Sequence, residues 1–260
     1  MRLEIDIGNT RIKWRTVRYD GIVAAHGSGL LAQASGLDAM DSVFDTVDLS
    51  AIEHVGVASV VPSVHPILTR WCEQRLGLLP EFARVVRYCA GVTNGYRDAS
   101  QMGVDRWLAI LAAYQRCAGA IVVSAGSAVT VDLLCGDGMH LGGYIVPGLR
   151  LMKESLRLNT DQVNIGHQQR QQSLVPGEST VEAVMRGVPL MVVGLVGDAV
   201  IRLQQHDGLG APPVLVTGGD GEYLVSLMVA RELPYVEYVP SLIFEGLSLA
   251  LGDPVLPVNE

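Results

Sequence analysis

Two short strands around a tight turn open the chain, and this hairpin constrains the fold more than any other feature. Within residues 3–14, apolar side chains alternate with polar ones on both sides of the Gly8-Asn9 dipeptide. Alternation with a period of two is typical of strands, and a glycine-containing turn of this kind joins two antiparallel strands. The chain therefore begins with a sheet, and the missing side chain at Gly8 lets a ligand approach the backbone of the turn.

The same turn is surrounded by polar side chains that suit a phosphate group. Asp6 precedes the turn, Thr10 lies in it and Lys13 follows it. Backbone N–H groups, the Thr10 hydroxyl and the Lys13 ammonium can cradle phosphate oxygens, and Asp6 could hold Mg²⁺ through water. An isolated match of this length is more often an ordinary turn, so the hypothesis needs a second observation.

A second hairpin of the same kind supplies that observation. Residues 121–134 comprise an apolar strand, a turn of small residues at 125–128 and a second strand with alternating side chains. Two similar hairpins, one opening each half of the chain, predict a duplicated fold with a nucleotide between the halves. We place the halves at residues 1–115 and 116–260.

Strands alternate with helices along the rest of the chain, which indicates the α/β class. Further strands are expected at 22–25, 55–61, 83–88, 120–124, 128–135, 139–146 and 214–217. Helices are expected at 64–76, 104–112, 178–205 and 240–251, with another after Pro147-Gly148 and a helix or turn at 31–40. Polar residues 159–177 are expected to form a flexible loop, and whether that loop acts as a lid stays open.

Composition narrows the class of partner. The chain has 260 residues, of which 49% are hydrophobic, so it can bury a substantial core as one large domain or two modest ones. Its 27 acidic residues against 19 basic ones argue against a nucleic-acid binder. The N-terminus shows no charged-then-apolar leader, and the apolar run at 188–196 is too short to span a bilayer, so we expect a buried helix there and no membrane partner.

The cysteines and histidines favour neither disulfides nor a metal centre. Four scattered cysteines in a chain of this length are typical of a reduced, cytoplasmic protein, and their spacings match no zinc site. The thiols are Cys72, Cys89, Cys117 and Cys135.

A candidate catalytic pair lies at the start of the helix predicted at 104–112. Val104 and Trp107 face the core in this pattern, so Asp105 and Arg106 point to another surface. The helix dipole stabilises an ionised Asp105, which could accept the proton of a bound hydroxyl as it attacks a γ-phosphate. Arg106 could bind a carboxylate of the same substrate. The alternative is a solvated pair in an ordinary first helical turn.

Two further motifs have both a functional and a structural interpretation. Thr217-Gly218-Gly219-Asp220 follows an apolar strand, and its glycines could pack against an adenine or ribose, or form a plain strand-to-helix turn. Thr180 follows Ser179 at the start of the long helix, where capping is the simpler interpretation.

In their order and spacing, these motifs resemble type III pantothenate kinase, a family of the acetate-and-sugar-kinase/Hsp70/actin superfamily. The resemblance extends over essentially the whole chain. It rests on Asp6-Ile7-Gly8-Asn9-Thr10 with Lys13, Asn94-Gly95-Tyr96, Gly103-Val104-Asp105-Arg106-Trp107, Gly126-Ser127-Ala128 with Thr130, Gly142-Gly143-Tyr144-Ile145 with Pro147-Gly148, Thr180 with Ala183 and Gly187, and Thr217-Gly218-Gly219-Asp220.

The resemblance implies an actin-like ATPase (ribonuclease H-like) fold with the nucleotide cleft between its halves, and ATP-dependent phosphorylation of pantothenate, the first step toward coenzyme A. Asp105 would be the general base, and Mg²⁺ would accompany ATP near Asp6. The ATP-binding residues would be Asp6, Ile7, Gly8, Asn9, Thr10, Arg11, Ile12, Lys13 and Ser127. The pantothenate pocket would be lined by Tyr96, Gly103, Val104, Asp105 and Arg106, with Thr180 contributed by the partner subunit of a homodimer.

One departure from the family pattern concerns the second phosphate loop. The family has Asp-x-Gly-Thr-Ala where this chain has Ser124-Ala125-Gly126-Ser127-Ala128. The resemblance implies that the missing aspartate binds a monovalent cation, K⁺ or NH₄⁺. A neutral hydroxyl at Ser124 binds such a cation less well, so we predict weak or absent potassium dependence. The departure also motivates an alternative, a non-catalytic dimeric ATP-binding or metabolite-sensing regulator. A third interpretation is a related kinase for another small hydroxy acid.

Overall fold

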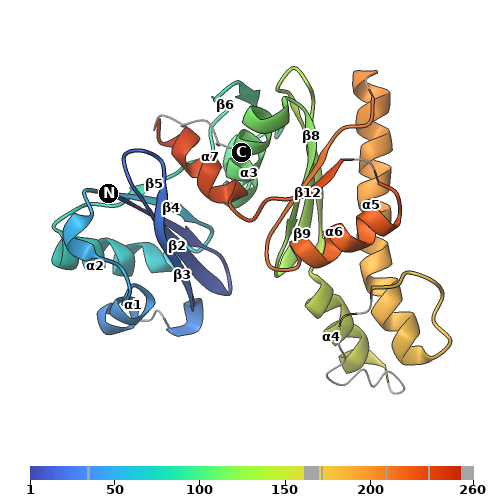
Figure 1. Cartoon of the computed structure of the whole chain (residues 1–260), viewed down its shortest axis with the longest axis horizontal. Coiled ribbons are helices and arrows are strands. Elements are labelled where there is room, and N and C mark those ends of the chain that lie inside the picture. The colour runs from blue at the N-terminus through green and yellow to red at the C-terminus, as the bar shows by residue number, and fades with distance from the viewer. Residues whose placement is uncertain (34–35, 161–169, 171, 209, 234, 253–260) are drawn as a thin grey trace. The chain divides into compact units, whose positions relative to one another are not determined.

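The chain divides into two compact units, each with its own sheet and core (Figure 1). The computed structural model describes residues 1–33, 36–160, 170, 172–208, 210–233 and 235–252. The first unit comprises Met1–Ala90, Asp98–Ala112 and the chain from Leu242 onward, and the second comprises Gly91–Arg97 and Ala113–Ser241. The first unit thus takes a helix from the end of the chain, which a single cut after residue 115 does not do.

The first unit is built on a five-stranded sheet with the order β3-β2-β1-β4-β5. Its strands are β1 (Arg2–Ile7), β2 (Arg11–Val17), β3 (Val23–Leu30), β4 (His54–Ser59) and β5 (Glu81–Phe82). The first three are antiparallel, and β4 and β5 run parallel to β1. The predicted opening hairpin is confirmed.

The two faces of this sheet have different partners. Leu3, Ile5 and Ile7 alternate along β1 into a core shared with α1 (Leu37–Val43) and α2 (His65–Leu76). The opposite face of β1 and β4 contacts α7 (Leu242–Ala250). Period-two alternation therefore separates an apolar face from the face that bears the polar side chains of β1. Short 3-10 helices occur at Leu31–Gln33, Leu49–Ala51, Pro62–Val64 and Ala99–Gln101.

The second unit repeats this topology with the strand order β10-β9-β8-β11-β12. Its strands are β8 (Ala120–Ala125), β9 (Ala128–Leu134), β10 (His140–Pro147), β11 (Val214–Thr217) and β12 (Val236–Tyr238). Again three strands are antiparallel, and two run parallel to the first. The duplicated α/β fold that the two hairpins predict is confirmed.

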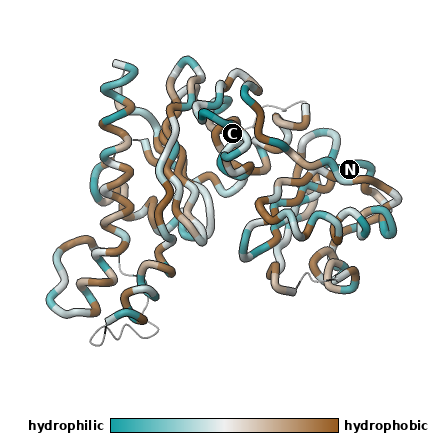
Figure 2. The backbone as a smooth tube through the Cα atoms, turned by 180° about the vertical axis from the view of Figure 1, so that it is seen from behind, coloured by the Kyte–Doolittle hydropathy of each residue, from teal (hydrophilic) through white to brown (hydrophobic). Residues whose placement is uncertain are grey.

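Among its described residues, the second unit wholly contains the helices α4 (Leu149–Asn159), α5 (Thr180–Asp207) and α6 (Gly221–Ala230). By length and composition α5 is apolar enough to cross a membrane. Its apolar side chains, among them Val192 and Val196, nevertheless pack into the core against β8 and β9. Apolar and polar segments alternate along this helix in Figure 2, as expected for a helix with one buried face.

Helix α3 (Val104–Cys117) differs from the amphipathic helix that its spacing predicts. Every residue from Arg106 to Ala113 is buried. A helix that is apolar on all sides in this stretch is a core helix. The i, i+3, i+4 pattern correctly located the helix but understated its burial, since alanines on the supposed outer face are small enough to be enclosed.

The strand predicted at 83–88 is wrong. The chain instead forms two two-residue strands, β5 and β6 (Tyr88–Cys89), with no regular structure between them. Segment 31–40 contains a 3-10 turn and the start of α1. Strand β12 has only three residues and no alternation of its own. Of the predicted loop at 159–177, residues 161–169 and 171 lie outside the described part of the chain.

Candidate active site

In the first unit, the tip of the β1–β2 hairpin is a tight turn with exposed polar residues. The N–H of Gly8 donates to the carbonyl of Arg11 across 3.0 Å, so Asn9 and Thr10 form the tip. Both tip residues are exposed, and the carbonyl of Thr10 accepts the N–H of Leu31 at 3.0 Å. The turn is thus centred on Asn9 and Thr10, one residue after the predicted Gly8-Asn9. The two hydrogen bonds hold it in place.

Asp6 lies at the end of β1, directly opposite Lys13 of β2. It is only 9% exposed. Burial raises the pKa of the Asp6 carboxyl from 3.8 to about 6, Lys13 opposes the rise, and the negative charge of Asp105 adds to it. Within the first unit the charge of Asp105 thus acts on Asp6, although burial is the larger cause of the shift.

Asp105 occupies the first turn of α3. Its Oδ1 accepts the N–H of Arg106 at 2.8 Å. A Cβ atom on Gly103 would lie 2.7 Å from that same oxygen, so only glycine leaves the carboxylate in this position. Asp105 is half-buried and Arg106 is 4% exposed. The interpretation of this pair as two solvated surface residues is therefore wrong.

The acidic pair suits a divalent cation. Carboxylate oxygens such as those of Asp6 and Asp105 are the hard ligands that Mg²⁺ prefers. A bound cation would favour the ionised form of Asp6, whose pKa burial otherwise raises. Asp6 would hold the ion, and the ion would neutralise charge on phosphate oxygens.

In the second unit, the turn between β8 and β9 packs against the start of α4. The N–H of Gly126 donates to the carbonyl of Ala128 at 2.9 Å, and the N–H of Gly148 donates to the carbonyl of Ser127 at 3.0 Å. A Cβ atom on Gly148 would lie 2.3 Å from the Gly126 carbonyl oxygen. The glycine after Pro147 is therefore required by the close approach of this turn.

A second glycine turn meets the same loop. Gly218 has a φ of +94°, and a Cβ atom on it would lie 2.3 Å from the carbonyl oxygen of Ala125. That oxygen also accepts the N–H of Asp220 at 3.0 Å. Three separate sequence motifs, around residues 124–128, 147–148 and 217–220, thus gather at one end of the second sheet.

The position of the missing aspartate has neutral oxygens around it. Ser124 is paired with Thr130 on one side and with Thr217 on the other. The hydroxyl of Thr130 is buried and has no hydrogen-bond partner among the described residues. Hydroxyl groups in this row carry no charge, so they fit a tightly held monovalent cation poorly.

Tyr96 follows β7 (Val92–Thr93) in the second unit. Its backbone N–H donates to Oδ1 of the buried Asn94 at 2.9 Å. Its ring stacks on the imidazole of His140, with the ring centroids 6.0 Å apart. The Asn-Gly-Tyr turn, in which only Gly95 is exposed, thereby holds its aromatic side chain in place.

Thr180 is not the cap of α5. The N-cap is Ser179, whose hydroxyl accepts the N–H of Glu182 at 3.3 Å. Thr180 is exposed at the first position of the helix. Its side chain is therefore not needed to start the helix.

Each unit therefore holds one part of the expected residue set. The first unit holds the β1–β2 tip with Asp6 and Lys13, together with Gly103, Val104, Asp105 and Arg106. The second unit holds Tyr96, Ser127 and Thr180.

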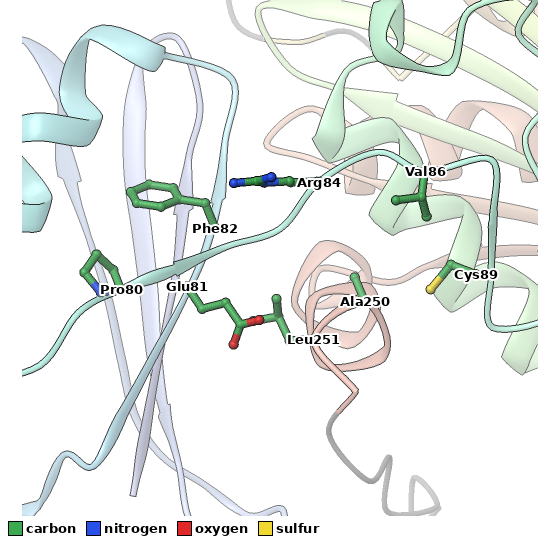
Figure 3. A pocket seen from close by; sticks show the side chains of 8 residues that line it. All are labelled: Pro80, Glu81, Phe82, Arg84, Val86, Cys89, Ala250 and Leu251. Atoms are coloured by element: carbon green, nitrogen blue, oxygen red, sulfur yellow. The ribbon is translucent and has the colours of Figure 1, made fainter.

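Two other features of the structure lie apart from these residues. A cavity of about 440 Å³ in the first unit (Figure 3) is lined by Pro80, Glu81, Phe82, Arg84, Val86, Cys89, Ala250 and Leu251, and by none of the predicted site residues.

In the second unit the ligating atoms of Cys135, His206 and Asp207 lie within 4.8 Å of one another, a group that a search for cysteine and histidine spacings missed. Asp207 there accepts the N–H of Gly136, and the thiol stays protonated because burial and then Asp207 raise its pKa to about 12.

Sequence reasoning also missed a cluster of buried polar contacts around Glu4, on the face of β1 that bears Asp6. Glu4 is fully buried on the same face of β1 as Asp6, and it contacts Arg2, Arg15 and Ser248 at 2.5–2.9 Å. The signal was present, since Glu4 alternates with apolar residues in a strand that is otherwise buried. Its partner on α7 could not be found from local pattern.

Comparison with known proteins decides the family. A sequence profile of type III pantothenate kinases matches residues 2–202. The type III pantothenate kinase of Pseudomonas putida (strain W619) is 37% identical over 257 residues, covering 96% of this chain and 98% of the relative. The chain belongs to the type III pantothenate kinase family. It is a phosphotransferase that phosphorylates pantothenate with ATP, as the motifs predict, and no comparison favours the non-catalytic alternative.

Solved structures confirm the actin-like fold of this kinase. A ROK family glucokinase from Streptomyces griseus in complex with glucose and AMPPNP has a TM-score of 0.52 at 14% identity, over 96% of this chain and 97% of that one. A Campylobacter jejuni protein described as a Baf family transcriptional activator has a TM-score of 0.63 at 23% identity, over 96% and 97% of the two chains. At these identities the likeness concerns the fold alone.

Proposed function

We propose that Asp105 is the general base of this pantothenate kinase. The observation that carries the proposal is the place of Asp105 in the first turn of α3, where its half-buried carboxylate accepts the N–H of Arg106 at 2.8 Å and its charge acts on the buried Asp6. A base must lie in a site where a reacting group can reach it, and Asp105 is the less buried of the two.

In the proposed step, the primary hydroxyl oxygen of pantothenate attacks the γ-phosphorus of ATP. The bond between that phosphorus and the β,γ-bridging oxygen breaks, ADP leaves, and Asp105 accepts the hydroxyl proton. Arg106 binds the carboxylate of pantothenate by charge-assisted hydrogen bonds. An arginine suits this role because its planar guanidinium presents N–H donors in a fork that matches a carboxylate.

Pantothenate is proposed to contact Tyr96 and the backbone of Gly103 and Val104 as well. Thr180 of a second copy completes the pocket, so the active form is a homodimer. The exposure of Thr180 supports this, since its side chain is available to a partner and is not used as a helix cap.

ATP is proposed to bind through the β1–β2 tip, residues Asp6–Lys13, and through Ser127, with Mg²⁺ held by Asp6. Tight turns with exposed N–H groups suit phosphate oxygens. We further propose that the enzyme works in the cytoplasm, which its four scattered free cysteines support, and that it needs neither nucleic acid nor membrane.

A coupled assay of ADP release tests the function. The chain is incubated with ATP and Mg²⁺, with and without pantothenate, and then with and without potassium. Turnover that requires pantothenate is expected. A folded protein that binds ATP without pantothenate-dependent turnover would instead support the regulator. Turnover with another small hydroxy acid alone would support the third interpretation.

A further inference from the structure

The loop that carries Tyr96 is held by the turn between β9 and β10. The backbone N–H of Thr93 donates to the carbonyl of Gly138 at 2.9 Å, and Thr93 forms an isolated bridge with Met139. These contacts join two segments of the second unit that are more than forty residues apart in the sequence. The orientation of the loop is therefore set by the β9–β10 hairpin.

Gly95 brings the two backbones into direct contact. A Cβ atom on Gly95 would lie 1.8 Å from the carbonyl oxygen of His140, so no other residue fits without moving one of the segments. Gly95 itself has an ordinary φ, and the constraint is therefore one of space alone. The residue before Tyr96 is thus placed against the residue whose ring Tyr96 stacks on.

The third contact is between side chains. The Tyr96 ring and the His140 imidazole are nearly parallel, at 15°, with their centroids 6.0 Å apart. His140 is 0% exposed, and its Nε2 lies 3.0 Å from Oδ1 of Asp132 on β9, which is 1% exposed. Asp132 is also confined from the other side, since a Cβ atom on Gly143 would lie 2.5 Å from the same oxygen.

The contact with Asp132 fixes the plane of the imidazole. Nε2 and Oδ1 of Asp132 share one hydrogen bond at 3.0 Å, between two side chains that are both buried. The other ring nitrogen, Nδ1, is buried without a hydrogen-bond partner among the described residues. The bond to Asp132 is thus the contact that sets the ring plane, and that plane is the surface on which Tyr96 rests.

Stability alone gives a weak reason for such a pair. Two ionisable side chains lose their hydration on burial, and well-packed apolar residues at such positions are often equally stable or more so. A buried polar pair is better explained where its hydrogen bond holds a neighbouring side chain in one orientation. Tyr96, half-buried in its loop, is that side chain.

We propose that Asp132 and His140 are positioning residues for pantothenate recognition, acting through the ring of Tyr96. The inference rests on the proposed function, because it requires that Tyr96 touches pantothenate. Neither Asp132 nor His140 reaches the substrate, since both are buried. Loss of either is expected to weaken the binding of pantothenate and to leave the binding of ATP unchanged.

Steady-state kinetics on the full-length chain test this with His140→Ala, His140→Phe, Asp132→Asn, Tyr96→Ala and the double variant of Tyr96→Ala with His140→Ala. His140→Ala is expected to raise the KM for pantothenate about tenfold and to change the KM for ATP less than about twofold. His140→Phe keeps the ring and loses the bond to Asp132, so a smaller rise is expected. Exposed His54, replaced by alanine, is the matched control and is expected to change neither constant.

The double variant separates positioning from general damage. If His140 acts through Tyr96, the double variant has the same KM for pantothenate as Tyr96→Ala alone. A purely structural role would lower kcat with the folded fraction and leave both KM values unchanged, and independent effects would add; either result overturns the proposal. Where His140→Ala does not fold, as judged by circular dichroism, the same comparison is made with His140→Phe and Asp132→Asn.

Failure of the function and failure of this inference give different results. Absence of pantothenate-dependent turnover in the unmodified chain rejects the proposed function. Normal turnover together with an unchanged KM for pantothenate in Tyr96→Ala rejects the contact of Tyr96 with the substrate, and the positioning role with it.

Discussion

Burial raises the pKa of Asp6, at the end of β1, Lys13 lowers it, and the negative charge of Asp105, at the start of α3, adds to the rise. These two carboxylates are almost one hundred residues apart in the sequence, yet both lie in the first unit and act on each other. The pair has a cost in the folded protein, because burial and mutual repulsion both disfavour the ionised form of Asp6. Such a cost is typical of groups that are kept for a cation or a reacting proton.

Asp6→Asn is expected to make the protein more stable and less active at pH 8. The folded pKa of Asp6, about 6, lies above its ordinary 3.8, so the folded chain binds the proton more tightly, and wild-type stability falls as pH rises from about 4 through 6. A shift of this size corresponds to about 3 kcal/mol at most. Thermal unfolding at several pH values checks this: the advantage of the variant should shrink from pH 8 toward pH 4. An advantage that is the same at all pH values would mean that Asp6 is not the titrating group.

Asp105→Asn is expected to lower kcat by about 10²–10⁴-fold, the range by which a general base accelerates a reaction. The amide keeps the size of the side chain and one oxygen for the N–H of Arg106, so the start of α3 should persist. The KM values for ATP and pantothenate should therefore change little. Single-turnover kinetics, with unfolding temperature as the control, measure the effect. A near-normal rate would assign the base to another group.

Local alternation made the hairpins predictable, and these carry most of the fold. The alternation in residues 3–14 and 121–134 located the strands on which both sheets are built. The start of α3 with Asp105 was also found, because an acidic first turn before a run of apolar residues is a local signal.

Contacts between distant segments could not be predicted in this way. The bond between Glu4 and Ser248 joins the two ends of the chain, and the stack of Tyr96 on His140 joins a loop to a hairpin. The sequence around each of these residues does not predict which distant residue it contacts. The two-residue strand β5 and the three-residue β12 are too short to carry a period. The motif pattern located the residues expected to touch ligands, but not those behind them.

Adjacent glycines in the second unit offer a paired test of the turn at 217–220. Gly218→Ala places a Cβ atom 2.3 Å from the Ala125 carbonyl oxygen at a φ of +94°, whereas alanine at Gly219 meets no atom within 4 Å. Gly218→Ala is expected to lower the free energy of unfolding by about 1–3 kcal/mol, and Gly219→Ala by less than about 0.5 kcal/mol. Denaturant titration of both variants measures this. Equal losses would mean that the turn is not tied to the β8–β9 loop.

Because Gly218 packs against the Ala125 carbonyl of the loop that carries Ser127, the KM for ATP is expected to rise in Gly218→Ala. The KM for pantothenate should stay unchanged if the turn serves only the nucleotide. Kinetics at saturating pantothenate distinguish the two effects, with folding verified by circular dichroism. A rise in both constants would extend the role of the turn to the second substrate.

Because Ser124 stands where the family has an aspartate, the rate of the enzyme is expected not to depend on potassium. The oxygens beside it, from Thr130 and Thr217, are neutral, so this row supplies no anion to hold K⁺ or NH₄⁺. The rate of the unmodified chain should change less than about twofold between potassium-free and potassium-rich buffer of equal ionic strength, whereas Ser124→Asp should show a saturable activation. Ser124→Asn introduces a neutral side chain of the same size as aspartate, so this control variant should show no activation by potassium. A steep rise of the wild-type rate with potassium would show that another group holds the cation.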